Sequence, residues 1–119
     1  MIYWINEIIR VNNAQLKSIN YIFCSDEYLL NINKEYLDHD YYTDIISFPF
    51  SESPDPIQGD IFISIDRVIE NASDNKTMFE HELLRVMSHG LLHFLGYKDK
   101  SDKNKAEMRN AEDEMIRLF

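Results

Sequence analysis

Apolar residues recur every three or four positions in the second half of the chain, which is the spacing of a helix that buries one face. The longest such segment covers residues 77–96, and its apolar stripe consists of Leu83, Leu84, Val86, Met87, Leu91, Leu92 and Leu95. Thr77 and Glu80 have the spacing of a capping box, and Gly96 suits the turn after a helix. These features predict a long helix that starts near Thr77 and ends just before Gly96.

Shorter apolar runs between polar residues fill the first half of the chain and predict strands over residues 2–5, 20–24, 43–48 and 60–65. Further helices are predicted over residues 12–19, 25–36 and 66–72 and from 101 to the end. Ser25 and Ser101 are the expected N-caps of two of them, and the last helix should bury Met108, Ala111, Met115 and Phe119. Strands that come early and helices that come late predict a single α+β domain over residues 1–119. Its small mixed sheet should have about four strands packed against three or more helices.

Charge and composition narrow the class of protein. The net charge of −9 argues against a protein that coats nucleic acid or an anionic membrane, although it leaves room for a local basic patch. The single cysteine, Cys24, excludes an intrachain disulfide and a cysteine-rich zinc site. No apolar run approaches the roughly 20 residues that span a bilayer. The first residues include an acid at Glu7 and lack a cationic leader, so we expect a cytoplasmic protein without membrane contact.

Two of the four histidines lie four residues apart on the predicted long helix. At that spacing His89 and His93 project from one face, with their β-carbons about 5–6 Å apart, so they can bind one cation together. Gly96 allows the chain to turn back, and Asp99 can then return a carboxylate to the same cation. Two histidines and one carboxylate leave a fourth position for water, which is the arrangement of a catalytic rather than a structural zinc site.

A histidine pair at helical spacing also occurs without a metal, and it is the addition of Gly96 and Asp99 that favours a metal site at the end of this helix. Gly90 occupies the position of the general base in metalloprotease helices, which counts against peptide hydrolysis. A mid-helix glycine costs about 1 kcal/mol, so we expect a strand, a substrate or another backbone to need that space. His81 should be a surface residue of the helix, and His39 either approaches the site or is solvated.

The segment HGLLHFLGYKD, residues 89–99, resembles the signature His-Gly-x-Leu-His-x-x-Gly-Tyr-Asp-His of the YbeY-type rRNA maturation factors. Residues 32–50, INKEYLDHDYYTDIISFPF, are similar to the family block Leu-Asn-x-x-Tyr-Arg-x-x-Asp-x-Pro-Thr-Asp-Val-Leu-Ser-Phe-Pro. Residues 59–64, GDIFIS, and 107–115, EMRNAEDEM, resemble a strand and the C-terminal helix of the family. These blocks follow the family's order and cover most of residues 32–115.

Several positions depart from the family pattern. Asp99 stands in place of the third histidine, and Lys98 in place of the aspartate before it. A carboxylate is still a sound zinc ligand, so the site should persist with changed electronics. Leu37 replaces an arginine that the family is thought to use on a phosphate, so that contact is either lost or made by another cation. Tyr42 replaces a family proline.

The resemblance implies a metal-dependent, single-strand endoribonuclease that acts in 16S rRNA maturation and ribosome quality control. It implies that His89, His93 and Asp99 are catalytic metal ligands, with zinc as the expected ion, although nickel, iron and manganese also accept such ligands. The expected partners are rRNA, on the ribosome or its small subunit, and ribosomal or GTPase proteins. The candidate substrate-binding residues are Lys98, Lys100, Thr43, Asp44 and Ser47.

Two other functions remain open from the sequence. One is a ribosome assembly factor in which the metal is mainly structural. This possibility stays open because Leu37 replaces the family arginine. The other is a metallohydrolase that acts on a different phosphoester or on a peptide. The lysine-rich segment 98–105 is also typical of an ordinary solvated surface. The polar residues at 43, 44 and 47 are equally typical of hydrogen bonding at a strand end.

Overall fold

A three-stranded mixed sheet and five helices make up the fold in the computed structural model, which describes residues 2–52 and 54–119. β1 (Leu16–Cys24) runs parallel to the central strand β3 (Ile57–Ser64), and β2 (Ile45–Pro49) pairs antiparallel with the other edge of β3. The predicted α+β class is confirmed, with three strands in the described residues rather than about four. The helices are α1 (Ile2–Val11), α2 (Asp26–Leu37), α3 (Ile65–Asp74), α4 (Phe79–Phe94) and α5 (Asp102–Arg117).

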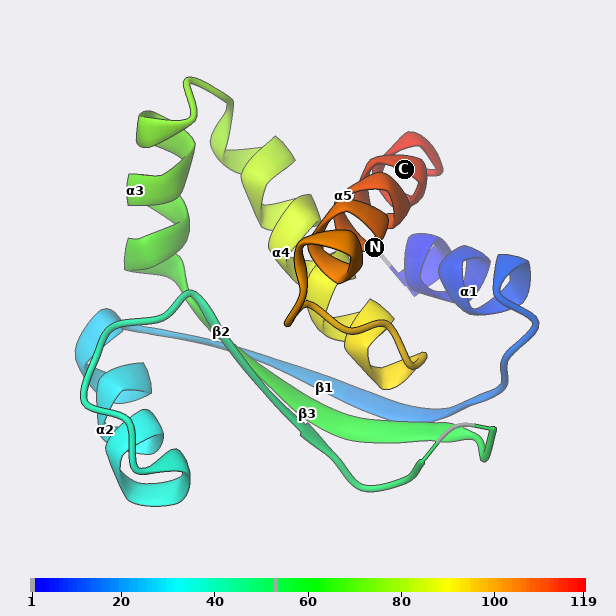
Figure 1. The fold of residues 1–119 in the computed structure, drawn as a ribbon, viewed down its shortest axis with the longest axis horizontal. Helices are drawn as coiled ribbons and strands as arrows, with labels where there is room; N and C mark the ends of the chain where they lie inside the picture. Colours follow the sequence, from blue (N-terminus) through cyan, green and yellow to red (C-terminus); the bar gives the residue numbers. More distant parts are fainter. Residues whose placement is uncertain (1, 53) are drawn as a thin grey trace.

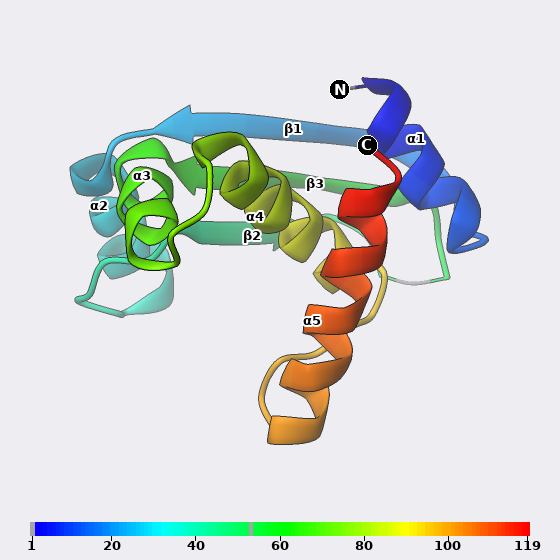
Figure 2. The ribbon, with the colours of Figure 1, turned by 90° about the horizontal axis from the view of Figure 1, so that it is seen from above.

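The helices cover both faces of the sheet (Figure 1). α2 packs on one face, where Leu29, Ile32 and Ile46 form a small core. α4 crosses the other face of the sheet, and α5 packs against α4, as the two views in Figures 1 and 2 show. Side chains of β3 alternate in burial, and Ile61 and Ile63 belong to the main core that α4 helps to form. The predicted histidine helix therefore rests directly on the sheet.

The N-terminal segment forms α1 and not the strand predicted for residues 2–5. Its buried residues, Trp4, Ile5, Ile8 and Ile9, recur at helical spacing, whereas a strand would place neighbours on opposite faces. Trp4 fixes this helix against α5, because its Nε1–H donates a hydrogen bond of 2.7 Å to the carbonyl of Met115. The short apolar run suggested a strand, but the period of the whole ten-residue segment is that of a helix.

The helix predicted over residues 12–19 is also wrong, because β1 begins at Leu16. Leu16 pairs with Ile57 and the register continues to Cys24, which pairs with Ser64. Pairing with a strand about 40 residues away in the sequence thus overrides the local helical pattern.

Most of the helix caps predicted from the sequence are found in the structure. Ser25 caps α2 by accepting a hydrogen bond from the backbone of Tyr28, and Ser101 forms a capping box with Asn104 at the start of α5. The capping box predicted at Thr77 is absent, because α4 begins at Phe79 behind an N-cap, Met78, that makes no side-chain bond. Of the predicted inner face of α5, Met108, Ala111 and Met115 are buried, whereas Phe119 lies beyond the helix and is 55% exposed.

None of the helices in the described part of the chain is both long and apolar enough to cross a membrane.

Gly90 brings α4 close to the sheet. A β-carbon at this position would lie 2.7 Å from Cδ1 of Ile45 in β2 and 3.2 Å from Ile61 in β3. The expectation that a neighbouring element needs this space is confirmed, and the neighbours are side chains of two strands. This close contact positions the adjacent His89 next to the start of β2.

Candidate metal centre

Three side chains lie together at the C-terminal end of α4, as the sequence spacing predicts. His89 and His93 project from one face of the helix, with their Nε2 atoms 3.0 Å apart. Gly96 has a φ of +104°, and the turn that it permits returns Asp99 to the helix. Oδ2 of Asp99 lies 3.3 Å from Nε2 of His89 and 3.2 Å from Nε2 of His93. The three atoms lie within 4.8 Å of one another and could hold one metal ion.

An acceptor fixes the opposite nitrogen of each histidine ring. Nδ1 of His89 lies 2.6 Å from Oε2 of Glu112, and Nδ1 of His93 lies 3.0 Å from the carbonyl oxygen of Tyr97. A carboxylate and a carbonyl can only accept a hydrogen bond, so each Nδ1 carries a proton and each neutral ring has a lone pair on Nε2. Metal-binding histidines are usually held in this way by a second layer of hydrogen bonds.

The chemistry of these donor atoms fits a divalent metal. Two Nε2 lone pairs and a carboxylate oxygen face one another at 3.0 to 3.3 Å, a contact that is repulsive unless a positive charge lies among them. A proton or a metal ion supplies that charge. Two imidazoles and one carboxylate are a donor set that zinc accepts, as do nickel, iron and manganese.

The groups that surround His89 carry negative charge. Burial alone lowers the pKa of His89, but the hydrogen bond and charge of Glu112 outweigh this effect. The charges of Asp99 and Asp44 raise the pKa further. The pKa of His89 therefore lies above its ordinary value. The same negative potential favours any cation at this position, whether a proton or a metal ion.

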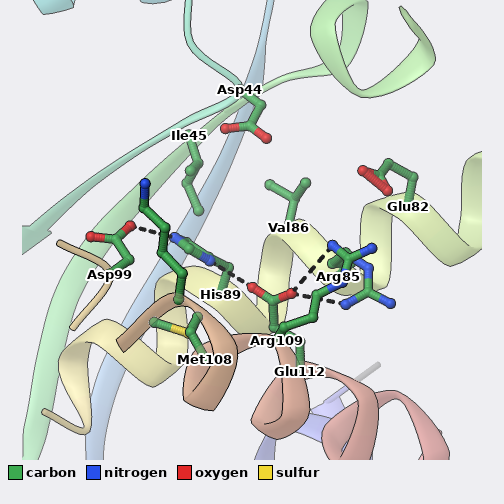
Figure 3. Close-up of a pocket in the computed structure, with 11 residues that line it drawn as sticks. Asp44, Ile45, Glu82, Arg85, Val86, His89, Asp99, Met108, Arg109 and Glu112 are labelled. Atoms are coloured by element: carbon green, nitrogen blue, oxygen red, sulfur yellow. Dashed lines mark hydrogen bonds and ion pairs between the residues drawn. The ribbon is translucent and has the colours of Figure 1, made fainter. Parts of the chain in front are cut away.

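Glu112 is a residue of this centre that the sequence analysis did not identify. Its side chain on α5 is buried, and while Oε2 holds His89, Oε1 accepts a hydrogen bond of 2.8 Å from Arg85 on α4 (Figure 3). Arg85 also donates a hydrogen bond of 2.7 Å to Asp113, so it joins α4 to α5. A signal was present in the sequence, because Glu112 lies four residues from Met108 and so places an acid on the buried face of α5.

Two hollows meet at this centre. The first, which we call the α5 hollow, has a volume of about 360 Å³ and lies between the start of β2 and helices α4 and α5 (Figure 3). The second, which we call the β2 groove, has a volume of about 610 Å³ and follows β2 towards the loop after α2. His89, Asp99 and Asp44 line both hollows, so a ligand that fills either one reaches two of the three candidate metal-ligand residues, His89 and Asp99.

The candidate substrate-binding residues are distributed unevenly around the centre. Thr43, Asp44 and Ser47 line the β2 groove. Lys98 lines a separate hollow beside Gly96 and Tyr97, and Lys100 is exposed. The cations that line the α5 hollow are instead Arg85, Lys105 and Arg109.

Asp44 lies in the wall that the two hollows share. Its Oδ2 accepts a hydrogen bond of 3.3 Å from Asn71 on α3, and its backbone carbonyl accepts one of 2.9 Å from Ser64 at the end of β3. Burial raises the pKa of Asp44, and the charge of His89 offsets this only in part. The carboxyl group is thus a partly desolvated group at the edge of the centre.

The other histidines and arginines have separate places. His81 is an exposed residue of α4, as expected. His39 lines the β2 groove, where its ring stacks on that of Tyr41. Arg67 joins α3 to α2 through a contact of 2.8 Å with Asp26.

The whole chain is similar to known proteins of one family. The family described as "Endoribonuclease YbeY" matches residues 2–119. A Flavobacterium psychrophilum protein named Endoribonuclease YbeY is 56% identical over 118 residues, which are 99% of this chain and 84% of that protein. The Cytophaga hutchinsonii protein of the same name is 54% identical over 97% of this chain and 80% of its own length.

The fold is shared with a solved structure as well. A solution structure of a Thermotoga maritima protein matches with a TM-score of 0.73 at 30% identity, over 98% of this chain and 76% of that one. The family match and the identity to these relatives extend over nearly the whole chain. The chain therefore belongs to the YbeY endoribonuclease family.

Proposed function

We propose that this chain, an RNA-cleaving hydrolase of the YbeY family, cuts single-stranded RNA at a divalent metal held by His89, His93 and Asp99. The observation that carries the proposal is the convergence of two Nε2 atoms and one carboxylate oxygen where two hollows meet. We propose zinc as the ion, 16S rRNA in maturation and ribosome quality control as the substrate, and the cytoplasm as the location.

The residues of the centre have distinct tasks in this proposal. A divalent ion, when bound, supplies Lewis-acid stabilisation of phosphate charge and makes a water molecule more acidic. Glu112 and the Tyr97 carbonyl keep Nε2 of each histidine free and aimed at the ion. The carboxyl group of Asp44, in the wall of both hollows, can accept a hydrogen bond from the attacking water or from a ribose hydroxyl.

Phosphate contacts have to be made without the family arginine, because Leu37 occupies its position in the β2 groove. The α5 hollow offers Lys105 and Arg109, whose side chains are exposed; the nearest carboxylate oxygen to Arg109, on Glu112, is 4.0 Å away. Lys98 and Lys100 can add charge at the rim. With a net charge of −9, RNA binding by the chain alone should be weak and sensitive to salt. The ribosome, its small subunit or ribosomal and GTPase proteins would then supply the remaining affinity.

The test compares RNA turnover and metal content in three proteins purified without a histidine tag. Wild type should cleave single-stranded RNA and contain about one equivalent of metal. His93→Ala should lose both properties. His81→Ala is the matched control, because it removes an exposed histidine from the same helix and should keep both.

Each alternative predicts a different result in the same experiment. Equal loss of RNA with wild type and His93→Ala would contradict the nuclease assignment and indicate a contaminating enzyme. Stoichiometric metal without RNA turnover would favour either alternative, an assembly factor in which the metal is structural or a metallohydrolase that acts on another substrate. Less than about a tenth of an equivalent of any transition metal in wild type would contradict a tight site.

A further inference from the structure

The β2 groove has a chemical character different from that of the α5 hollow. Apart from the carboxylates and histidines of the metal centre, its lining is neutral, and none of the described residues that form it is lysine or arginine. Its far end is formed by Asn33 and Leu37 of α2 and by His39 and Tyr41 of the following loop. A phosphate would find no lysine or arginine side chain there, whereas a neutral planar group would find an apolar and aromatic surface.

The lining of this groove includes two stacked rings from the loop after α2. The rings of His39 and Tyr41 stack with their centroids 5.1 Å apart and their planes inclined by 24°. The hydroxyl oxygen of Tyr41 lies 3.0 Å from Nδ1 of His39, which keeps the two rings in register. Tyr41 nevertheless remains 55% exposed, so much of its surface is open to a ligand.

The backbone beneath these rings is anchored independently of them. Asn33, only 2% exposed, donates a hydrogen bond of 2.9 Å from Nδ2 to the carbonyl of Tyr41. The backbone N–H of His39 donates one of 3.1 Å to the carbonyl of Asn33. Asp38, with a φ of 55°, reverses the chain between α2 and the loop. The aromatic pair is therefore presented by a fixed turn that a buried amide holds in place.

We propose that Tyr41, backed by His39, is a stacking platform for an unpaired nucleobase of the RNA strand that occupies the β2 groove. Stacking on an aromatic ring stabilises single-stranded RNA binding by roughly 1–3 kcal/mol per base, without regard to sequence. A base within a duplex has both faces covered and cannot stack here, so the platform selects single strands. Leu37 extends the apolar wall where an arginine would have favoured phosphate. The inference rests on the proposed function in taking RNA as the ligand.

The test measures binding of metal-loaded protein to a fluorescent 2′-O-methyl single strand by anisotropy, with strand integrity checked afterwards. An abasic strand of the same length and charge serves as the comparison. Wild type should bind the base-bearing strand about tenfold more tightly than the abasic one. Tyr41→Ala should lose this preference and Tyr41→Phe should keep it. Tyr28→Ala is the matched control, because Tyr28 is an equally exposed aromatic residue of α2 outside the groove lining.

Equal affinities of wild type and Tyr41→Ala, or of wild type for the two strands, would overturn the platform. In cleavage assays Tyr41→Ala should raise KM about tenfold with little change in kcat, and an unchanged KM would contradict the inference while leaving the nuclease assignment intact. Conversely, a Tyr41-dependent preference for bases in a protein that cleaves no RNA would uphold the platform and refute the proposed function.

Discussion

Glu112 connects the metal centre to the packing of two helices. It is 4% exposed, yet both of its oxygens are used, one by Arg85 and the other by His89. A buried carboxylate is costly unless such partners satisfy it. Its negative charge next to the imidazole strengthens the histidine as a ligand, and its position fixes the ring orientation.

Glu112→Gln should weaken metal binding about tenfold to a hundredfold, because the amide keeps a hydrogen-bond acceptor for Nδ1 of His89 but removes the charge. The measurement is a competition titration against a chelator of known affinity. Glu114→Gln removes the same charge from an exposed position two residues further along α5 and should leave the affinity unchanged. Equal affinities of Glu112→Gln and wild type would show that the contact with His89 serves packing alone.

The sequence identifies residues of the centre only where the spacing is local. His89, His93 and Asp99 lie within eleven residues, and helix geometry with one glycine turn is enough to bring them together. Glu112 reaches His89 across 23 positions, and that contact depends on how α5 packs against α4. The roles of Lys98, Lys100, Thr43, Asp44 and Ser47 in substrate binding stay predictions.

Asp26 joins three elements at the end of the sheet. Its Oδ1 accepts a hydrogen bond of 2.6 Å from Ser64 at the end of β3, and its Oδ2 accepts one of 2.8 Å from Arg67 on α3. It also lies in the first turn of α2, where the helix dipole favours an acid. Partial burial alone raises the pKa of Asp26, but the hydrogen bonds from Ser64 and Arg67 outweigh it and lower the pKa.

Asp26→Asn should lower the free energy of unfolding by about 1.5–3 kcal/mol at pH 7, the usual range for hydrogen bonds to a charged group. The pKa of Asp26 is lower in the folded state than in the unfolded state, where it is near 4. The ionised carboxylate therefore stabilises the fold fully above about pH 4, and this contribution is lost as the pH falls through the folded-state pKa. The difference between wild type and variant should therefore shrink below about pH 4.

Urea unfolding at a series of pH values measures this dependence. Glu35→Gln, an exposed acid on the same helix, is the control and should change stability little at any pH. A stability difference for Asp26→Asn that stays constant down to the lowest pH would contradict the ionic origin of the effect.

At the level of elements, the sequence was most informative where a pattern was long. The period over residues 77–96 placed α4 correctly, while the four apolar residues at 2–5 were too few to separate a strand from a helix. β1 was predicted only from residue 20, since its first half is polar enough to resemble a helix and becomes a strand by pairing with β3. A partner strand distant in the sequence decided the case of β1, whereas the period of the whole ten-residue segment decided that of α1.

Metal binding should stabilise the whole fold, because the unfolded chain does not bring the ligands of the ion together. The three donor atoms come from α4 and the turn after it, and their orientation depends on α5. A free ion concentration one hundred times the Kd should stabilise the fold by about 2.7 kcal/mol. For a domain of this size that corresponds to a rise in Tm of roughly 10 °C.

Thermal unfolding with and without a chelator measures this shift. His89→Ala should show no rise in Tm on addition of zinc, whereas His81→Ala should respond as wild type does. An equal rise in wild type and His89→Ala would place the bound ion elsewhere on this acidic chain.

The central place of β3 has a consequence for the order of folding. β1 and β2 both pair with β3 and not with each other, so neither can form its ladder until the last of the three strands is available. The β2–β3 hairpin closes a short loop, whereas β1 must be recruited across α2 and β2, a contact of high sequence separation that slows folding. We therefore expect this hairpin, with α4 docked on it, to form first and the recruitment of β1 to limit the rate of folding.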